Sequence, residues 1–106
     1  MIGRRARAEW EAVTSHVDAL LREYRSKSVE SLRALPDYET LPGFRVGDHE
    51  WLIYTQVARL KDGSVSFAII ASRECWFARL AGGNGFVMDA SGQSRDLTIE
   101  ERRDLT

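Results

Sequence analysis

The stretch WLIYTQVARLKDGSVSFAIIAS, residues 51–72, decides the fold of this chain. Two runs rich in β-branched and aromatic residues flank the dipeptide Asp62-Gly63, which is typical of the tight turn of a β-hairpin. We therefore expect two long antiparallel strands, at residues 49–60 and 64–77, joined by this turn.

The type of turn decides which residues of the first strand face the core. In the second strand one alternating set is expected to face inward: Val65, Phe67, Ile69 and Ala71. A two-residue turn would align with this set Leu60, Ala58, Gln56, Tyr54 and Leu52. A type I turn with a bulge at Gly63 exchanges the faces and aligns instead Val57, Thr55, Ile53 and Trp51. We favour the bulged turn because it buries the more apolar set.

Upstream of the hairpin, residues 4–25 contain neither Gly nor Pro. Apolar side chains recur there at intervals of three and four residues: Ala6, Trp10, Val13, Val17, Leu20, Leu21 and Tyr24. This period predicts one amphipathic helix whose apolar stripe packs against the sheet. Ser28 is expected to cap a short second helix that ends before Pro36, and residues 36–43 are interpreted as a connection.

Turn signals divide the remaining chain. Residues 44–46 are predicted as a short strand, linked by Gly47-Asp48 to the first long strand. The glycines of AGGNG, residues 81–85, are interpreted as a flexible hairpin turn that leads into the strand GFVMD. Residues 94–97 could add a short edge, and Thr98, three residues before Glu101, predicts a capping box at a final helical turn.

The predicted fold is thus α+β, with the helices packed on a curved four-stranded antiparallel meander. One domain covers residues 1–106, with a helical part at 4–35, an antiparallel sheet at 43–97 and a tail at 98–106. A hydrophobic content of 43% is enough for one core.

The net charge of −1 provides no basic field for nucleic acid or for an anionic membrane surface, so neither partner is expected. The single cysteine cannot form an internal disulfide, and no apolar run approaches the roughly 18 residues of a membrane span. The N-terminal residues also develop no apolar signal region. We therefore expect a soluble cytoplasmic protein.

Residues that could carry chemistry form no catalytic or cofactor motif. Cys75 has Arg73 and Arg79 nearby, yet a free cysteine usually acts as a small buried hydrophobe, and we expect it inside or at the edge of the sheet. Two histidines are too few for a His-rich metal site, and His49 lies between two acids that point to the other face of a strand. No metal and no cofactor is predicted.

Other charged groups are interpreted as solvated. The carboxylates of Glu9 and Glu11 are expected on an exposed helix face rather than in a shielded acid/base pair. The basic residues of RRAR, at positions 4, 5 and 7, are expected at a solvated helix end, with an anion-binding arm as the alternative.

Two functions remain open from the sequence. The first is a binding domain that self-associates, as a homodimer, through the outer face of the sheet. Ile70 and Ala68 are expected on this face, because they point away from the core set. The second is a small-molecule or catalytic pocket between helix and sheet. Its polar groups would be Tyr54, Gln56, Arg73, Glu74, Cys75 and Trp76. We favour binding over enzymatic catalysis.

The order of elements over residues 4–97, a long helix followed by an antiparallel meander, resembles the cystatin-like group of folds, which includes the NTF2-like cone. Cystatin protease inhibitors carry a QxVxG loop, whereas the nearest segment here, residues 56–60, reads QVARL and lies within a predicted strand. NTF2-like enzymes place acid/base residues in their cone, but no Asp-His pair can be assigned. Residues 24–40 also resemble small bacterial proteins of unassigned function, a likeness that implies no activity.

Overall fold

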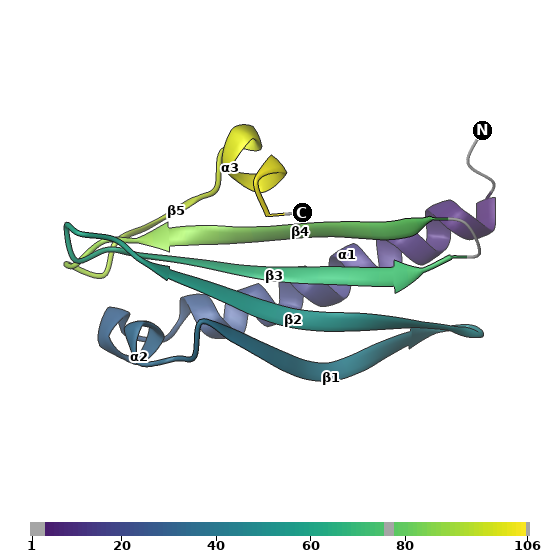
Figure 1. Cartoon of the computed structure of the whole chain (residues 1–106), viewed down its shortest axis with the longest axis horizontal. Helices are drawn as coiled ribbons and strands as arrows, with labels where there is room; N and C mark the ends of the chain where they lie inside the picture. Colours follow the sequence, from purple (N-terminus) through teal and green to yellow (C-terminus); the bar gives the residue numbers. More distant parts are fainter. Residues whose placement is uncertain (1–3, 76–77, 106) are drawn as a thin grey trace.

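A long helix and an antiparallel sheet make up the fold (Figure 1). The computed structural model describes residues 4–75 and 78–105. The helices are α1 (Arg4–Arg25), α2 (Val29–Arg33) and α3 (Ile99–Arg103). The strands are β1 (Tyr38–Val46), β2 (His49–Arg59), β3 (Val65–Glu74), β4 (Arg79–Met88) and β5 (Ser94–Asp96). They form a five-stranded sheet in chain order, and each strand is antiparallel to its neighbours.

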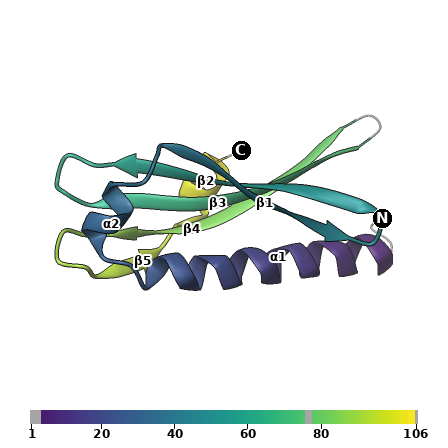
Figure 2. The same ribbon diagram turned by 90° about the horizontal axis from the view of Figure 1, so that it is seen from below.

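Helix α1 runs along one face of the sheet, as Figure 2 shows from the side. Its bounds match the predicted helix, and Val13, Val17 and Leu21 of the predicted stripe are buried in the core with Phe67 and Ile69. Trp10 differs, because 44% of its surface remains exposed. The N-terminal part of the stripe is therefore less completely covered than its middle.

The predicted register of the central hairpin is confirmed. Val57 lies opposite Phe67 and Ile53 opposite Ala71, so the more apolar set faces α1. Gly63 has a φ of 89° and its N–H donates to the carbonyl of Leu60, as a turn with a glycine bulge requires. The positive φ explains why glycine occupies this position.

The sheet has five strands rather than the four predicted from the sequence. Its first edge strand is also longer than the strand predicted at residues 44–46. The segment read as a connection, residues 36–43, mostly belongs to β1, which begins at Tyr38. Pro42 fits within β1 because this strand is an edge strand and its pairing with β2 shifts between Leu41 and Phe44. Residues 94–96 form the fifth strand.

The glycine-rich segment AGGNG is not a hairpin turn, which corrects the sequence interpretation. All of it lies within β4, opposite residues 68–72 of β3. A side chain at Gly85 would clash with the carbonyl of Phe67 and lie 2.8 Å from the Cα atom of Ala68. The chain instead reverses after β3, where the N–H of Cys75 donates to the carbonyl of Ala78 at 2.7 Å. The half-buried Cys75 therefore follows the last residue of a strand, at the end of the sheet.

The outer sheet face is less open than expected. Ile70 and Ala68 are 0% and 2% exposed within the single chain, so the predicted apolar patch does not include them. Leu52 and Tyr38 on the same face are exposed. The remaining outer apolar surface is thus carried by β1 and β2.

The predicted caps are confirmed. The Ser28 hydroxyl accepts a hydrogen bond from the N–H of Ser31 at the start of α2. Thr98 and Glu101 form the reciprocal capping box of α3. Both helices are only five residues long, so these caps satisfy a large share of their free N–H groups.

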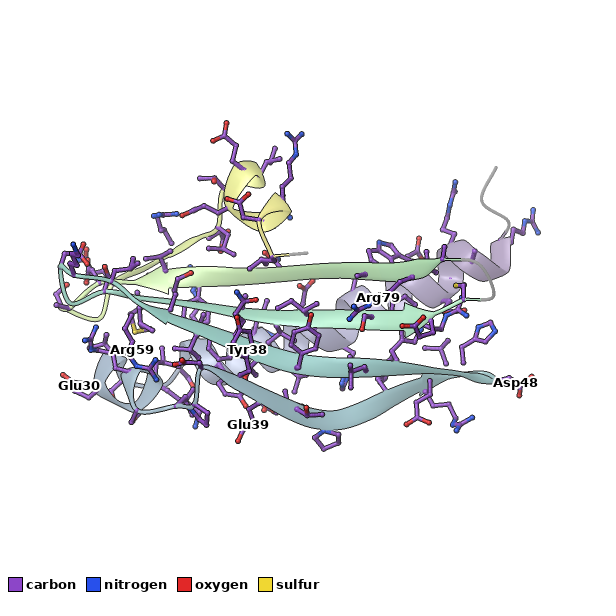
Figure 3. All side chains as sticks on the ribbon, in the orientation of Figure 1. Glu30, Tyr38, Glu39, Asp48, Arg59 and Arg79 are labelled. Atoms are coloured by element: carbon purple, nitrogen blue, oxygen red, sulfur yellow. The ribbon has the colours of Figure 1, made fainter. Side chains whose placement is uncertain are left out.

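Arginine side chains fasten α2 to the sheet. Arg59, labelled in Figure 3 between β2 and α2, donates to the carbonyls of Arg33 and Leu35 and, at 2.5 Å, to the carboxylate of Asp37. Arg33 in turn donates to the carbonyl of Ser64 at 3.2 Å. The opposite end of β2, marked in Figure 3 by Asp48 in the turn before it, lies beside the beginning of α1 (Figure 2).

Candidate functional site

A pocket of about 490 Å³ lies between the first turns of α1 and the sheet. In Figure 2, β3 and β4 diverge from α1 toward this end, while the hairpin of β1 and β2 stays beside the helix. The residues that line the pocket come from α1, β2, β3 and β4. The pocket is therefore part of the layered fold itself.

The walls of the pocket are mainly apolar: Ala6, Trp10, Trp51, Leu80 and Ala81. The rings of Trp10 and Trp51 pack against each other with centroids 5.8 Å apart and an interplanar angle of 55°. Gly82 lies beneath Trp10, and a Cβ atom there would be 2.5 Å from the Cη2 atom of the indole. The glycine thus allows Trp10 to lie close to the backbone of β4.

The carboxylate of Glu9 joins three elements at the base of the pocket. His49 Nδ1 lies 2.8 Å from Glu9 Oε1, and the indole N–H of Trp51 donates to Oε2 at 2.8 Å. Arg73 Nε lies 2.9 Å from the same Oε2 atom. Because an ionised carboxylate only accepts, Nδ1 of His49 carries the proton of that contact.

The surroundings of Glu9 favour its charged form. The Glu9 side chain is only 11% exposed, and burial alone would raise its pKa. The hydrogen bonds from His49 and Trp51 and the charge of Arg73 outweigh burial, and the pKa falls below its ordinary value of 4.5. Glu9 is therefore a fixed negative charge near neutral pH.

Arg73 is the second charged group of the site. Its side chain is 18% exposed, and its guanidinium carbon lies 5.7 Å from the centroid of the Trp51 ring. Its Nε is an ion-pair neighbour of Glu9, but the N–H direction leaves this buried nitrogen without an aligned acceptor. Within residues 4–75 and 78–105, no hydrogen bond is made by its two terminal nitrogens. The two terminal nitrogens of Arg73 can therefore donate hydrogen bonds to another group.

Arg73 also lines a second hollow, of about 360 Å³, together with His49, Ser72 and Arg79. The Arg79 guanidinium donates to the hydroxyl of Ser72 at 3.2 Å. Arg73 and His49 thus line the same hollow, and both side chains contact Glu9. In the described part of the chain, no cluster of three or more His, Cys, Asp or Glu side chains could hold a metal ion.

The described members of the predicted set of site residues lie in different places on the sheet. Arg73 lines the pocket, but Tyr54 and Gln56 lie opposite Ile70 and Ala68, on the sheet face away from α1. Glu74 is exposed and belongs to the second hollow. Trp76 lies outside the described residues, and Cys75 is absent from the described lining of either hollow.

Sequence reasoning missed Glu9, which is not a solvated side chain but the centre of a partly buried contact network. It also assigned no acid–histidine pair, whereas Glu9 and His49 form one. A usable signal was present, because Glu9 lies about 100° around the helix from Trp10 and so borders the apolar stripe. The two tryptophans on facing elements were a second signal.

A search of protein families, of curated proteins and of solved structures found no match to this chain. Among the described residues, no helix is long and apolar enough to cross a membrane.

Proposed function

We propose that this protein binds a small organic molecule with an apolar, planar body in the pocket between α1 and the sheet. The observation that carries the proposal is a hollow of about 490 Å³ walled by Trp10 and Trp51. Ligand pockets usually occupy about 300–1,000 Å³ and combine apolar walls with a few convergent polar groups. Glu9 and Arg73 supply such groups here.

The exposed part of Trp10 gives the ligand its driving force. An aromatic body that buries about 150 Å² of apolar surface gains roughly 4 kcal/mol. That value corresponds to a dissociation constant of about 1 mM before any polar contact is counted. Planar ligands fit best, because two of the apolar walls are the indole rings of Trp10 and Trp51.

A neutral planar probe, 1-naphthaleneacetamide, tests this proposal. Titration followed by ¹H–¹⁵N NMR should shift the indole N–H resonance of Trp51, and calorimetry should give a dissociation constant of about 1 mM or lower. Ala6→Phe places a ring in the pocket and should weaken binding at least about tenfold. Ala8→Phe is the control, because Ala8 is exposed on the same helix and does not line this pocket. Equal binding by the two variants would contradict the proposal.

Self-association through the outer sheet face is the second candidate function. It is supported by the exposed side chains of Leu52 and Tyr38, which lie on this face of β2 and β1. Light scattering coupled to size exclusion should then give twice the monomer mass, and Leu52→Lys should return the monomer. A wild-type monomer at high concentration would contradict a homodimer.

The finer fold assignment and the location of the protein are further proposals. A helix followed by consecutive antiparallel strands supports the cystatin-like resemblance. The single unpaired cysteine supports a cytoplasmic location.

A further inference from the structure

An apolar ligand alone leaves Arg73 without a role in the pocket. Its guanidinium is mostly withdrawn from water, yet its ion-pair partner Glu9 already accepts from Trp51 and contacts His49. Its Nε is buried and lacks an aligned acceptor, whereas its two terminal nitrogens are not buried and make no described hydrogen bond. These terminal nitrogens can therefore donate to an acceptor on a ligand in place of water.

The charges of the residues that line the pocket also favour a ligand that carries an acceptor. Arg7, Glu9 and Arg73 line it, so two positive charges face one negative charge. Glu9 is engaged on both of its oxygens, by His49 on one and by Trp51 and Arg73 on the other. The lining therefore has a surplus of one positive charge, to which Arg7 and Arg73 both contribute.

We infer that the ligand is an organic acid whose carboxylate is bound by Arg73 while its planar body packs against Trp10. This inference rests on the proposed function and specifies the class of ligand. The planar fork of an arginine matches a carboxylate in a two-hydrogen-bond arrangement, which a lysine could not reproduce. Trp51 holds the guanidinium from one side, with its ring centroid 5.7 Å away, and so limits the orientations of the fork.

Glu9 is the ion-pair partner of the proposed carboxylate-binding residue. Its Oε2 atom lies 2.9 Å from Nε of Arg73. The negative charge of Glu9 opposes an incoming acid at short range. Removing the charge of Glu9 should therefore change acid binding in the opposite direction from removing the charge of Arg73.

The test compares two probes of equal shape, 1-naphthaleneacetate and its neutral amide, by calorimetry at low salt. Wild-type protein should bind the acid at least about tenfold more tightly than the amide, a difference of about 1.4 kcal/mol. Raising the salt concentration should weaken binding of the acid and leave the amide unchanged. If the amide binds as well as the acid, this inference is overturned and the proposed function stands. If neither binds, both fail.

Three variants locate the charge that matters. Arg73→Gln should abolish the preference for the acid without changing the amide, whereas Glu9→Gln should strengthen binding of the acid severalfold. Arg45→Gln removes an exposed charge at the same end of the sheet, where Arg45 pairs with Glu50, and should preserve the preference. Equal loss of preference in the Arg45 and Arg73 variants would overturn the inference. Should Arg73→Gln not fold, the wild-type ratio and Glu9→Gln still decide it.

Discussion

The two ends of the sheet use arginine in different ways. At the α2 end, Arg59 donates to two backbone carbonyls and to a carboxylate, so its guanidinium is satisfied within the chain. At the opposite end, the ion-pair partner of Arg73 among the described residues is a shared oxygen of Glu9, and its buried Nε lacks an aligned acceptor. The hydrogen bonds of Arg59 hold the segment that follows α2 in place, whereas the terminal nitrogens of Arg73 can donate to another group beside the pocket.

This difference extends to the packing. Near α2 the ring centroids of Tyr24 and Phe67 lie 4.5 Å apart, and those of Phe67 and Phe86 lie 5.5 Å apart. Phe67 and Phe86 are buried. Near the N-terminal end of α1, the paired rings of Trp10 and Trp51 border a hollow. The closely packed rings thus lie at the first end, and the proposed ligand pocket lies at the second.

Truncation of one ring at each end gives the largest expected effect. Phe67→Ala should lower the free energy of unfolding by about 3–5 kcal/mol, because it leaves a cavity in the core. Trp10→Ala should cost less than half as much, because 44% of Trp10 is already exposed. Urea denaturation of both variants measures the difference. Equal losses would mean that the two ends are equally stabilising.

Two glycines of β4 provide a finer comparison. Gly85→Ala forces a Cβ atom against the backbone of β3 and should cost about 1–3 kcal/mol or more. Gly82→Ala meets the outer edge of the Trp10 ring, which can turn aside, and should cost less than about 1 kcal/mol. Thermal unfolding checks both, and the Trp10 resonances should move only in the second variant. A Gly82 variant as unstable as the Gly85 variant would show that Trp10 is rigidly held.

Acid titration gives the smallest expected effect. The depressed pKa of Glu9 means that its charged form is favoured in the folded state. This contribution is complete above the ordinary pKa of 4.5 and is lost as the pH falls through the lower folded value. Stability of the wild type should therefore fall more steeply than that of Glu9→Gln below about pH 5.

The comparison with Glu9→Gln isolates one group in that titration. The pKa values of Asp62, Asp89 and Glu101 are also lowered, mainly by hydrogen bonds from Ser64, Ser91 and Arg95, so the wild type alone would report all of them. Unfolding midpoints in urea, measured from pH 6 to pH 3, provide the curves. Parallel curves for the two proteins would contradict the interpretation of the contacts of Glu9.

The sequence predicts those elements whose local pattern agrees with their environment. The period of α1, the turn at Asp62-Gly63 and the capping box at Thr98 each have a local cause, and each is observed. Residues 38–43 are different, because Pro and Glu disfavour a strand and only pairing with β2 forms one. The AGGNG segment is a strand for the same reason.

The candidate site was only partly predictable. Arg73 was named from sequence, but its presumed partners Tyr54 and Gln56 lie on the other sheet face, since the register that buries Trp51 turns them outward. Contacts such as that between Glu9 and His49 join positions far apart in the chain. They depend on how α1 is placed along β2, which no local pattern encodes.

The irregular pairing at Pro42 also affects how copies of this protein meet in a concentrated solution. A proline offers no N–H to an incoming strand, and the shifted register around it bends the border of the sheet. Another molecule cannot therefore continue the ladder smoothly beyond β1. This edge is protected against the strand-by-strand growth that leads to fibrils.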